Sequence, residues 1–171
     1  MFEIRKAGLA DAGRIAQIHA ETWSAAYHEF ISADFLDNKA KLEPRLQMWN
    51  ELLSQEHESH YVAVNDGTIV GFFSIGIPRD ADIPETDCEL IGIYFDRAFW
   101  HRGFGTRAMQ FAVDRAKERG CKQMVLWVFQ ENRNAVAFYG KSGFRFDGAT
   151  NVLTLGKPVT ECRYRLQLLD E

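Results

Sequence analysis

An apolar strand that leads through a short loop into a glycine-punctuated helix start is the feature that most constrains this chain. The segment from Cys88 to Met109 reads CELIGIYFDRAFWHRGFGTRAM, and its first part is rich in β-branched and aromatic residues. After Gly103 and Gly105, apolar residues recur at the spacing of an amphipathic helix. Glycines let an anion approach the backbone closely, and the first N–H groups of a helix have no partner inside it. We therefore expect a phosphate group to bind where this helix begins.

The residues around the glycines exclude two common phosphate sites. No Gly-Lys-Ser or Gly-Lys-Thr follows them, which disfavours a nucleotide-binding P-loop. Met109 stands near the place of a third glycine, and the strand lies late in the chain, which disfavours a dinucleotide-binding Rossmann motif. Gly-Phe-Gly alone is equally compatible with a tight turn before an ordinary helix, so a second motif is needed.

That second motif is the segment from Asn132 to Phe144, which reads NRNAVAFYGKSGF and follows an apolar run at residues 124–129. Asn132 or Asn134 can cap a short helix, and Gly143 can end it in the left-handed conformation. The pattern predicts a strand, a loop, a short helix and a returning strand.

Together the two segments resemble the GCN5-related N-acetyltransferase (GNAT) superfamily. Its first motif is R/Q-x-x-G-x-G/A after a strand, and its later motif is N-x-x-A-x-x-x-Y followed by K-x-G-F. The matching residues are Gly103 and Gly105 for the first motif, and Asn132, Ala135, Tyr139, Lys141, Gly143 and Phe144 for the second. Trp100 departs from the pattern, because Arg or Gln is usual there. We expect this departure to alter loop packing more than cofactor binding.

The resemblance implies the α/β acyl-CoA N-acyltransferase fold: a twisted, mostly antiparallel sheet with one parallel pair of strands splayed around acetyl-CoA. Gly92 suits a bulge that helps to part these strands, or simply avoids a clash in the core. The expected contacts of the pantetheine arm are the backbones of Ile93, Tyr94 and Phe95. Those of the diphosphate are His101, Arg102, Gly103, Phe104, Gly105 and Thr106, and Asn132 also faces the cofactor.

The pattern along the chain agrees with a mixed sheet in one domain spanning residues 1–171. Strands are expected near 2–6, 60–66, 68–77, 87–95, 122–128, 144–153 and 160–169, and helices near 9–27, 32–40, 43–55, 103–119 and 134–142. Asn65, Asp66 and Gly67 between two apolar runs predict a hairpin. The strands on either side of the 103–119 helix are expected to form the parallel pair.

Tyr139 is the expected general acid and Glu89 the expected general base. A phenol with a pKa of about 10 stays protonated at neutral pH and can give its proton to a departing thiolate. Seven residues separate Asn132 from Tyr139, which places both on about the same helix face. By pattern alone, Tyr139 could instead pack in the core. For the base, Asp87 and His28 remain alternatives.

The acceptor is expected to contact the amino-terminal third of the chain. Trp23, Tyr27 and Phe30 recur there at helical spacing, with His19 and His28 nearby. The segment resembles the Trp-x-x-x-Tyr pattern of many bacterial members, whose first helices form one wall of the acceptor cleft. We expect Trp23, Tyr27 and His28 to bind substrate, although such aromatic residues often only pack in a core.

Composition excludes several other classes. A hydrophobic fraction of 46%, a charged fraction of 26% and a net charge of −4 are typical of a soluble domain without nucleic-acid partners. No run approaches the roughly 20 apolar residues of a membrane span, so we expect a cytoplasmic protein. The three cysteines are far apart and predict neither a metal site nor disulfides. A homodimer through the apolar C-terminal strand remains open.

From the resemblance, the expected activity is transfer of an acetyl group from acetyl-CoA to a primary amine by direct attack. A small amine or amino-acid derivative is the favoured acceptor. Two alternatives remain: acetylation of a protein or peptide amino group, and a non-catalytic acyl-CoA sensor that keeps the glycine loop.

Overall fold

The computed structural model describes residues 1–55 and 59–169. Seven strands form one sheet in the order β1-β2-β3-β4-β5-β7-β6. The strands are β1 (Phe2–Lys6), β2 (Ser59–Asn65), β3 (Thr68–Gly76), β4 (Cys88–Phe95), β5 (Gln123–Phe129), β6 (Arg145–Thr154) and β7 (Pro158–Gln167). The helices are α1 (Ala12–Tyr27), α2 (Ala33–Lys39), α3 (Leu42–Leu53), α4 (Phe104–Glu118) and α5 (Arg133–Lys141). Every expected element is present, with ends that shift by a few residues at most.

The parallel pair expected around α4 is confirmed. β4 and β5 pair in parallel, whereas every other neighbouring pair within the described sheet is antiparallel. A parallel connection needs a crossover long enough to return to the same edge, and α4 supplies it. The chain therefore has a mixed α/β sheet, as the sequence predicted.

The hairpin between β2 and β3 turns through two residues with left-handed backbone. Asp66 has φ 49° and Gly67 has φ 79°. A two-residue turn of this kind matches the twist of the flanking strands. The predicted hairpin is therefore confirmed.

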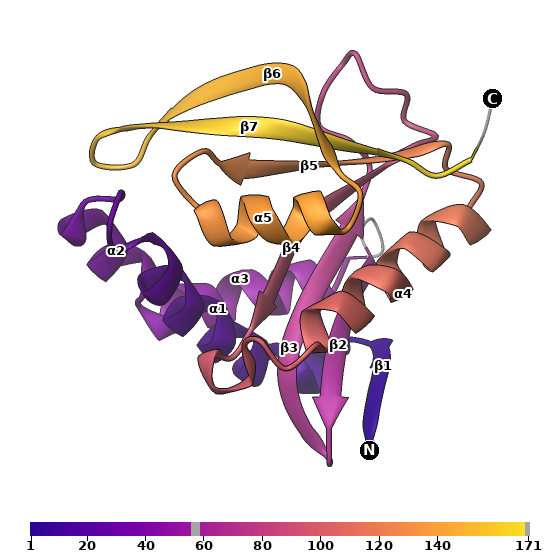
Figure 1. Cartoon of the computed structure of the whole chain (residues 1–171). Coiled ribbons are helices and arrows are strands. Elements are labelled where there is room, and N and C mark those ends of the chain that lie inside the picture. The colour runs from indigo at the N-terminus through magenta and orange to yellow at the C-terminus, as the bar shows by residue number, and fades with distance from the viewer. Residues whose placement is uncertain (56–58, 170–171) are drawn as a thin grey trace.

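Helices cover both faces of the sheet (Figure 1). Val62, Val64 and Phe72 pack against α1 and α3, whereas Ala63 and Phe73 pack in a separate core that includes α4 and α5. Successive strand residues point to opposite faces, so this alternation follows directly from the pleat of the sheet. A third cluster joins α1 and α2 to the ends of β5 and β7.

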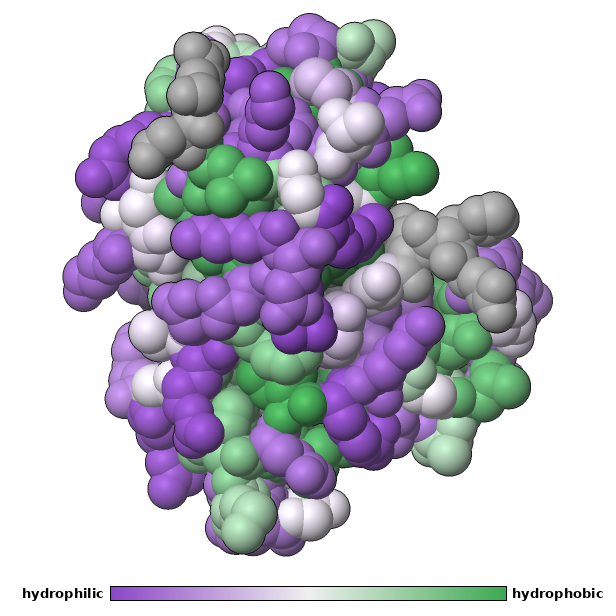
Figure 2. Space-filling view, turned by 90° about the vertical axis from the view of Figure 1, so that its right-hand side faces the viewer, coloured by the Kyte–Doolittle hydropathy of each residue, from purple (hydrophilic) through white to green (hydrophobic). Residues whose placement is uncertain are grey.

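Figure 2 views the molecule from the side of α4 and β1, where hydrophilic side chains dominate and apolar ones fill smaller areas between them. This agrees with the interleaved acidic and basic residues at the end of α4. Within the described residues, the helices are too short or too polar to span a bilayer. Cys88, Cys121 and Cys162 are buried and free.

The strand order bears on the homodimer that the sequence left open. The C-terminal strand β7 lies between β5 and β6, so it has a paired strand on each side and offers no free edge. The described sheet ends at β1 and β6 instead. A homodimer formed by pairing through the C-terminal strand is therefore closed to this chain.

Candidate active site

The centre of the candidate site is the wedge where β4 and β5 part. The two strands pair only at Cys88 with Met124 and at Glu89 with Val125. The Asp87 carboxylate fastens the closed end, because it accepts hydrogen bonds from the backbone of Lys122 at 2.9 Å and Gln123 at 3.2 Å. Beyond this point the strands have no cross-strand partners on their facing edges, so the wedge exposes main-chain groups to a ligand.

A bulge on the other side of β4 accompanies the separation. Ser74 pairs with Gly92 and Ile75 with Leu90, so Ile91 is the additional residue, next to the glycine that predicted it. A Cβ atom on Gly92 would lie 2.7 Å from Cε2 of Tyr94. Gly92 is thus required for the Tyr94 ring to fold back over the strand.

The loop after β4 is fixed by side chains from both ends. The Asp96 carboxylate accepts a hydrogen bond from the backbone N–H of Ala98 at 3.0 Å and forms an ion pair with Arg14 of α1 at 2.6 Å. Trp100, the residue that departs from the family pattern, donates its Nε1–H to the Phe95 carbonyl at 2.6 Å. Trp100 therefore takes part in the packing of the loop, and the carbonyl that accepts its hydrogen bond belongs to a residue expected to face the pantetheine arm.

The start of α4 has the features of an anion site. Gly103 precedes the helix with φ 81°, a left-handed conformation that favours glycine. Gly105 has no such requirement, and a Cβ there would meet only Phe138 at 3.6 Å, an ordinary contact. The protein's own packing does not explain Gly105, whereas close approach of a ligand to the N–H groups of Phe104, Gly105 and Thr106 does.

Two further residues of this loop were expected to contact the diphosphate. His101 has φ 58°, an uncommon left-handed conformation for a residue with a side chain. The Arg102 guanidinium carbon lies 5.4 Å from the Phe99 ring centroid and 6.0 Å from that of Phe104. This places the positive charge of Arg102 beside the first residue of α4, where it adds to the attraction for an anion.

On the other side of the wedge, α5 carries the expected general acid. Asn132 caps this helix by accepting the Ala135 N–H at 3.2 Å, which is one of the two caps that the sequence allowed. Tyr139 lies on α5 and is 8% exposed, packed against Phe138 and Phe144. Burial, and secondly the neighbouring Tyr94, raise the pKa of Tyr139 above its usual value. The phenol is therefore protonated at neutral pH.

Aromatic residues of α1 pack against the last residue of β5. Burial raises the pKa of Tyr27, and smaller contributions come from the phenols of Tyr94 and Tyr139. The Tyr27 ring lies 4.9 Å from Trp23 and 5.1 Å from Phe129, centroid to centroid. Two expected acceptor residues, Trp23 and Tyr27, thus pack against each other, and Tyr27 also contacts the end of β5.

Other expected residues are placed differently. His28 is exposed after the end of α1, with Nδ1 3.1 Å from the Ala25 carbonyl. Glu89 is 1% exposed, and its carboxylate accepts hydrogen bonds from Nε of Arg79 at 2.8 Å and from the Arg79 backbone at 3.0 Å. The Asp87 carboxylate accepts hydrogen bonds from the backbone N–H groups of Lys122 and Gln123, as described above. Glu89 therefore lies at the apex of the wedge with both oxygens engaged.

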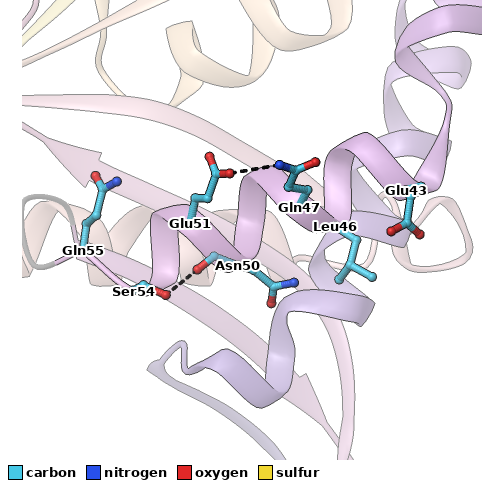
Figure 3. Close-up of a pocket in the computed structure, with 7 residues that line it drawn as sticks. All are labelled: Glu43, Leu46, Gln47, Asn50, Glu51, Ser54 and Gln55. Carbon is cyan, nitrogen blue, oxygen red and sulfur yellow. Dashed lines mark hydrogen bonds between the residues drawn. The ribbon is translucent and has the colours of Figure 1, made fainter.

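A surface hollow elsewhere carries none of these groups. It is lined by Glu43, Leu46, Gln47, Asn50, Glu51, Ser54 and Gln55 (Figure 3). All seven belong to α3 or to the residues just after it. Within this set, Gln47 donates to the Glu51 carboxylate and the Ser54 hydroxyl donates to the Asn50 carbonyl. No group of three or more potential metal ligands occurs within the described residues.

One partly buried residue and one buried residue near the site were not predicted as part of it. His19 lies among aromatic rings, with its centroid 4.9 Å from Tyr94, and Arg45 lies 5.1 Å from the Trp23 centroid. Arg45 precedes Trp49 by one helical turn, and both are buried on α3. A cation on the apolar face of an amphipathic helix is the sequence signal that would have drawn attention to it.

Comparisons with known proteins agree with this arrangement. The model of the acetyltransferase (GNAT) family matches residues 16–144. An uncharacterized N-acetyltransferase of Bacillus subtilis, YuaI, is 27% identical over 143 residues, which cover 83% of this chain and 80% of the relative.

Two solved structures share the fold over nearly their whole length. PaiA N-acetyltransferase from Thermoplasma acidophilum, in complex with coenzyme A, has a TM-score of 0.76 and 21% identity, covering 98% of this chain and 99% of the other. YncA, a putative acetyltransferase from Salmonella typhimurium with its cofactor acetyl-CoA, has a TM-score of 0.74 and 22% identity, covering 99% and 95%. With the family motifs, the splayed parallel strands and the matching family model all in one chain, this protein belongs to the acetyltransferase (GNAT) family.

Proposed function

We propose that this protein transfers an acetyl group from acetyl-CoA to the primary amine of a small molecule or amino-acid derivative. The observation that carries the proposal is the wedge itself: two parallel strands that pair at only two positions and part beside a glycine-led helix start. Membership of the acetyltransferase family supports the reaction class, and the coenzyme A complexes of the two neighbours support the donor.

The diphosphate of the donor binds the main-chain N–H groups at the start of α4, where the helix dipole favours negative charge. The pantetheine arm follows β4 and hydrogen-bonds to the backbone of residues 93–95, as an added strand would. This arrangement leaves the thioester near the phenols of Tyr94 and Tyr139.

In the reaction, the neutral amine attacks the thioester carbonyl, a C–N bond forms and the C–S bond breaks. Tyr139 donates its proton to the departing sulfur. Because burial makes the phenolate costly, this transfer accompanies C–S cleavage, when the sulfur is most basic.

Glu89 is the proposed base for the proton that the amine loses. Its carboxylate lies at the apex of the wedge, held by Arg79, so a proton reaches it through water or after Arg79 moves aside. Replacing Glu89 with Gln should shift or remove the acidic limb of the pH–rate profile. An unchanged profile would assign the Glu89–Arg79 pair to structure alone, and His28 would then be tested in the same way.

Trp23 and Tyr27 form the proposed wall of the acceptor site, with His28 at its outer end. Release of free thiol from acetyl-CoA in the presence of a panel of amines tests the reaction. Release that depends on a small amine supports the proposal. Release only with peptides would identify a protein or peptide acetyltransferase, and binding of coenzyme A without any release would identify a sensor.

A matched pair of Tyr-to-Phe variants tests the role of Tyr139. Tyr139→Phe should lower kcat by about 100-fold or more, since a positioned acid typically contributes that much, and should leave the coenzyme A affinity within about two-fold. Tyr61→Phe serves as the control, because Tyr61 stacks on Phe73 in the core on the α4 side of the sheet. Equal turnover of the two variants would remove Tyr139 from the mechanism.

A further inference from the structure

Two buried hydrogen-bond donors near Tyr27 lack an acceptor within the described part of the chain. One is Nη2 of Arg45, and the other is Nε1 of Trp23. Arg45 is 7% exposed, and its guanidinium carbon lies 5.1 Å from the centroid of the Trp23 ring, so the two donors belong to one place. Donors buried without an acceptor cost folding free energy, so each one calls for an explanation, such as an ion or a ligand that supplies the acceptor.

The positive charge of Arg45 is also uncompensated. Its Nε donates to the Lys39 carbonyl at 2.7 Å, but no carboxylate among residues 1–55 and 59–169 forms an ion pair with it. Its electrostatic neighbours are the phenols of Tyr94 and Tyr27. A guanidinium keeps its charge even when it is buried, so this site favours an anion.

The pKa of His19 responds to the same positive charge. His19 lies between Trp49 and Tyr94, and burial together with the positive charges of Arg45 and Lys39 lowers its pKa to about 3. Neutral His19 adds no charge of its own to this positive field.

Contacts between aromatic residues connect these donors to the proposed acceptor site. Tyr27 contacts Trp23 and interacts with Tyr94 and Tyr139, while Arg45 interacts with Tyr27 and Tyr94. Successive contacts from Arg45 to Trp23, from Trp23 to Tyr27 and from Tyr27 to Phe129 therefore lead from the two donors to the last residue of β5.

We propose that Nη2 of Arg45 and Nε1 of Trp23 bind the carboxylate of the acceptor, and that the acceptor is therefore a free amino acid or an amino-acid derivative that keeps its carboxylate. This inference rests on the proposed acetyl transfer and narrows its substrate class. The two oxygens of a planar carboxylate can each accept one of these N–H groups. The role is binding and positioning of the acceptor, and the amine remains free to attack the thioester.

The test compares acceptors that differ only in the carboxylate. Thiol release from acetyl-CoA is measured with each amino acid of a panel, with its primary amide and with its decarboxylated amine. We expect kcat/KM to be about 10- to 100-fold higher for the acid than for the amide, as for a charge-assisted hydrogen bond. Equal or better use of the amides or amines would overturn the inference while leaving acetyl transfer intact. Absence of release with every amine, despite coenzyme A binding, would instead refute the proposed function.

Variants test whether Arg45 and Trp23 cause the preference for the acid over the amide. Arg45→Gln should reduce the acid-to-amide ratio of kcat/KM to near one by raising KM for the acid, with coenzyme A affinity unchanged. Arg119→Gln, an exposed residue after the end of α4, should keep the ratio of the unmodified protein. If Arg45→Gln does not fold, Trp23→Phe removes one donor without changing charge and should lower the ratio several-fold. A ratio that survives in a folded Arg45→Gln or in Trp23→Phe would overturn the assignment.

Discussion

The free energy of unfolding should fall in acid because of one histidine, His19, which lies among aromatic rings. His19 lies between Trp49, Phe72 and Tyr94, at centroid distances of 4.9 to 5.8 Å. Its Nδ1 accepts a hydrogen bond from Nε1 of Trp49 at 3.1 Å. That nitrogen cannot also carry a proton, so protonation requires both the loss of this bond and the burial of a charge.

The magnitude follows from the difference between the folded and unfolded states. Histidine has an ordinary pKa of 6.5, and burial, with the charges of Arg45 and Lys39, lowers the pKa of His19 to about 3. Below pH 6.5 the unfolded chain therefore binds the extra proton, and stability falls as the pH falls from 6.5 towards 3. At pH 5 the loss is about 2 kcal/mol relative to pH 7.5, from about 1.5 units at about 1.4 kcal/mol each.

Urea unfolding followed by circular dichroism at pH 7.5 and pH 5.0 measures this loss. His19→Gln is the matched variant, because its amide oxygen can accept the Trp49 hydrogen bond and does not titrate. His60, whose pKa is also lowered by burial, is present in both proteins and cancels. The unmodified protein should lose about 2 kcal/mol more than the variant. Equal losses, or an NMR titration of His19 with a midpoint above pH 5, would refute the reasoning.

Three further substitutions separate structural from ligand-binding roles. Gly103→Ala should lower the free energy of unfolding by about 1 kcal/mol, because φ 81° is costly for alanine; unchanged stability in denaturant would contradict this. Gly105→Ala should leave the free energy of unfolding equal or slightly higher, since the new Cβ meets only Phe138 within the protein. The same change should weaken coenzyme A binding at least several-fold in calorimetry, and unchanged affinity would exclude close approach of the diphosphate. Asn132→Ala should cost about 1 kcal/mol through loss of the α5 cap, and a thermal melt that does not move would show the cap to be dispensable.

Features that depend on neighbouring residues were predictable from the sequence. Apolar periodicity placed the helices and strands, Asp66 and Gly67 marked the hairpin, and Gly92 marked the bulge. The glycine-led start of α4 was predictable for the same reason, because main-chain N–H groups bind a ligand through local backbone geometry. The family motifs then supplied the function that such a helix start serves.

Features that depend on contacts between distant segments were not predictable. The insertion of β7 between β5 and β6 closes the dimer route through the C-terminal strand. Glu89 was expected as the general base, but its ion pair with Arg79, from the loop between β3 and β4, was not foreseen. A role for Arg45 could not be predicted, because Trp23, which it contacts, lies on another helix. Neither spacing nor propensity encodes such contacts.

The most direct test of the central claim is a titration of the ¹⁵N-labelled protein with coenzyme A and, separately, with pantetheine, which lacks the diphosphate. Coenzyme A should shift the amide signals of Phe104, Gly105 and Thr106 strongly and those of residues 93–95 as well. Pantetheine should shift only residues 93–95. If saturating coenzyme A leaves the amides at the start of α4 unmoved, these groups do not bind the diphosphate and the account fails.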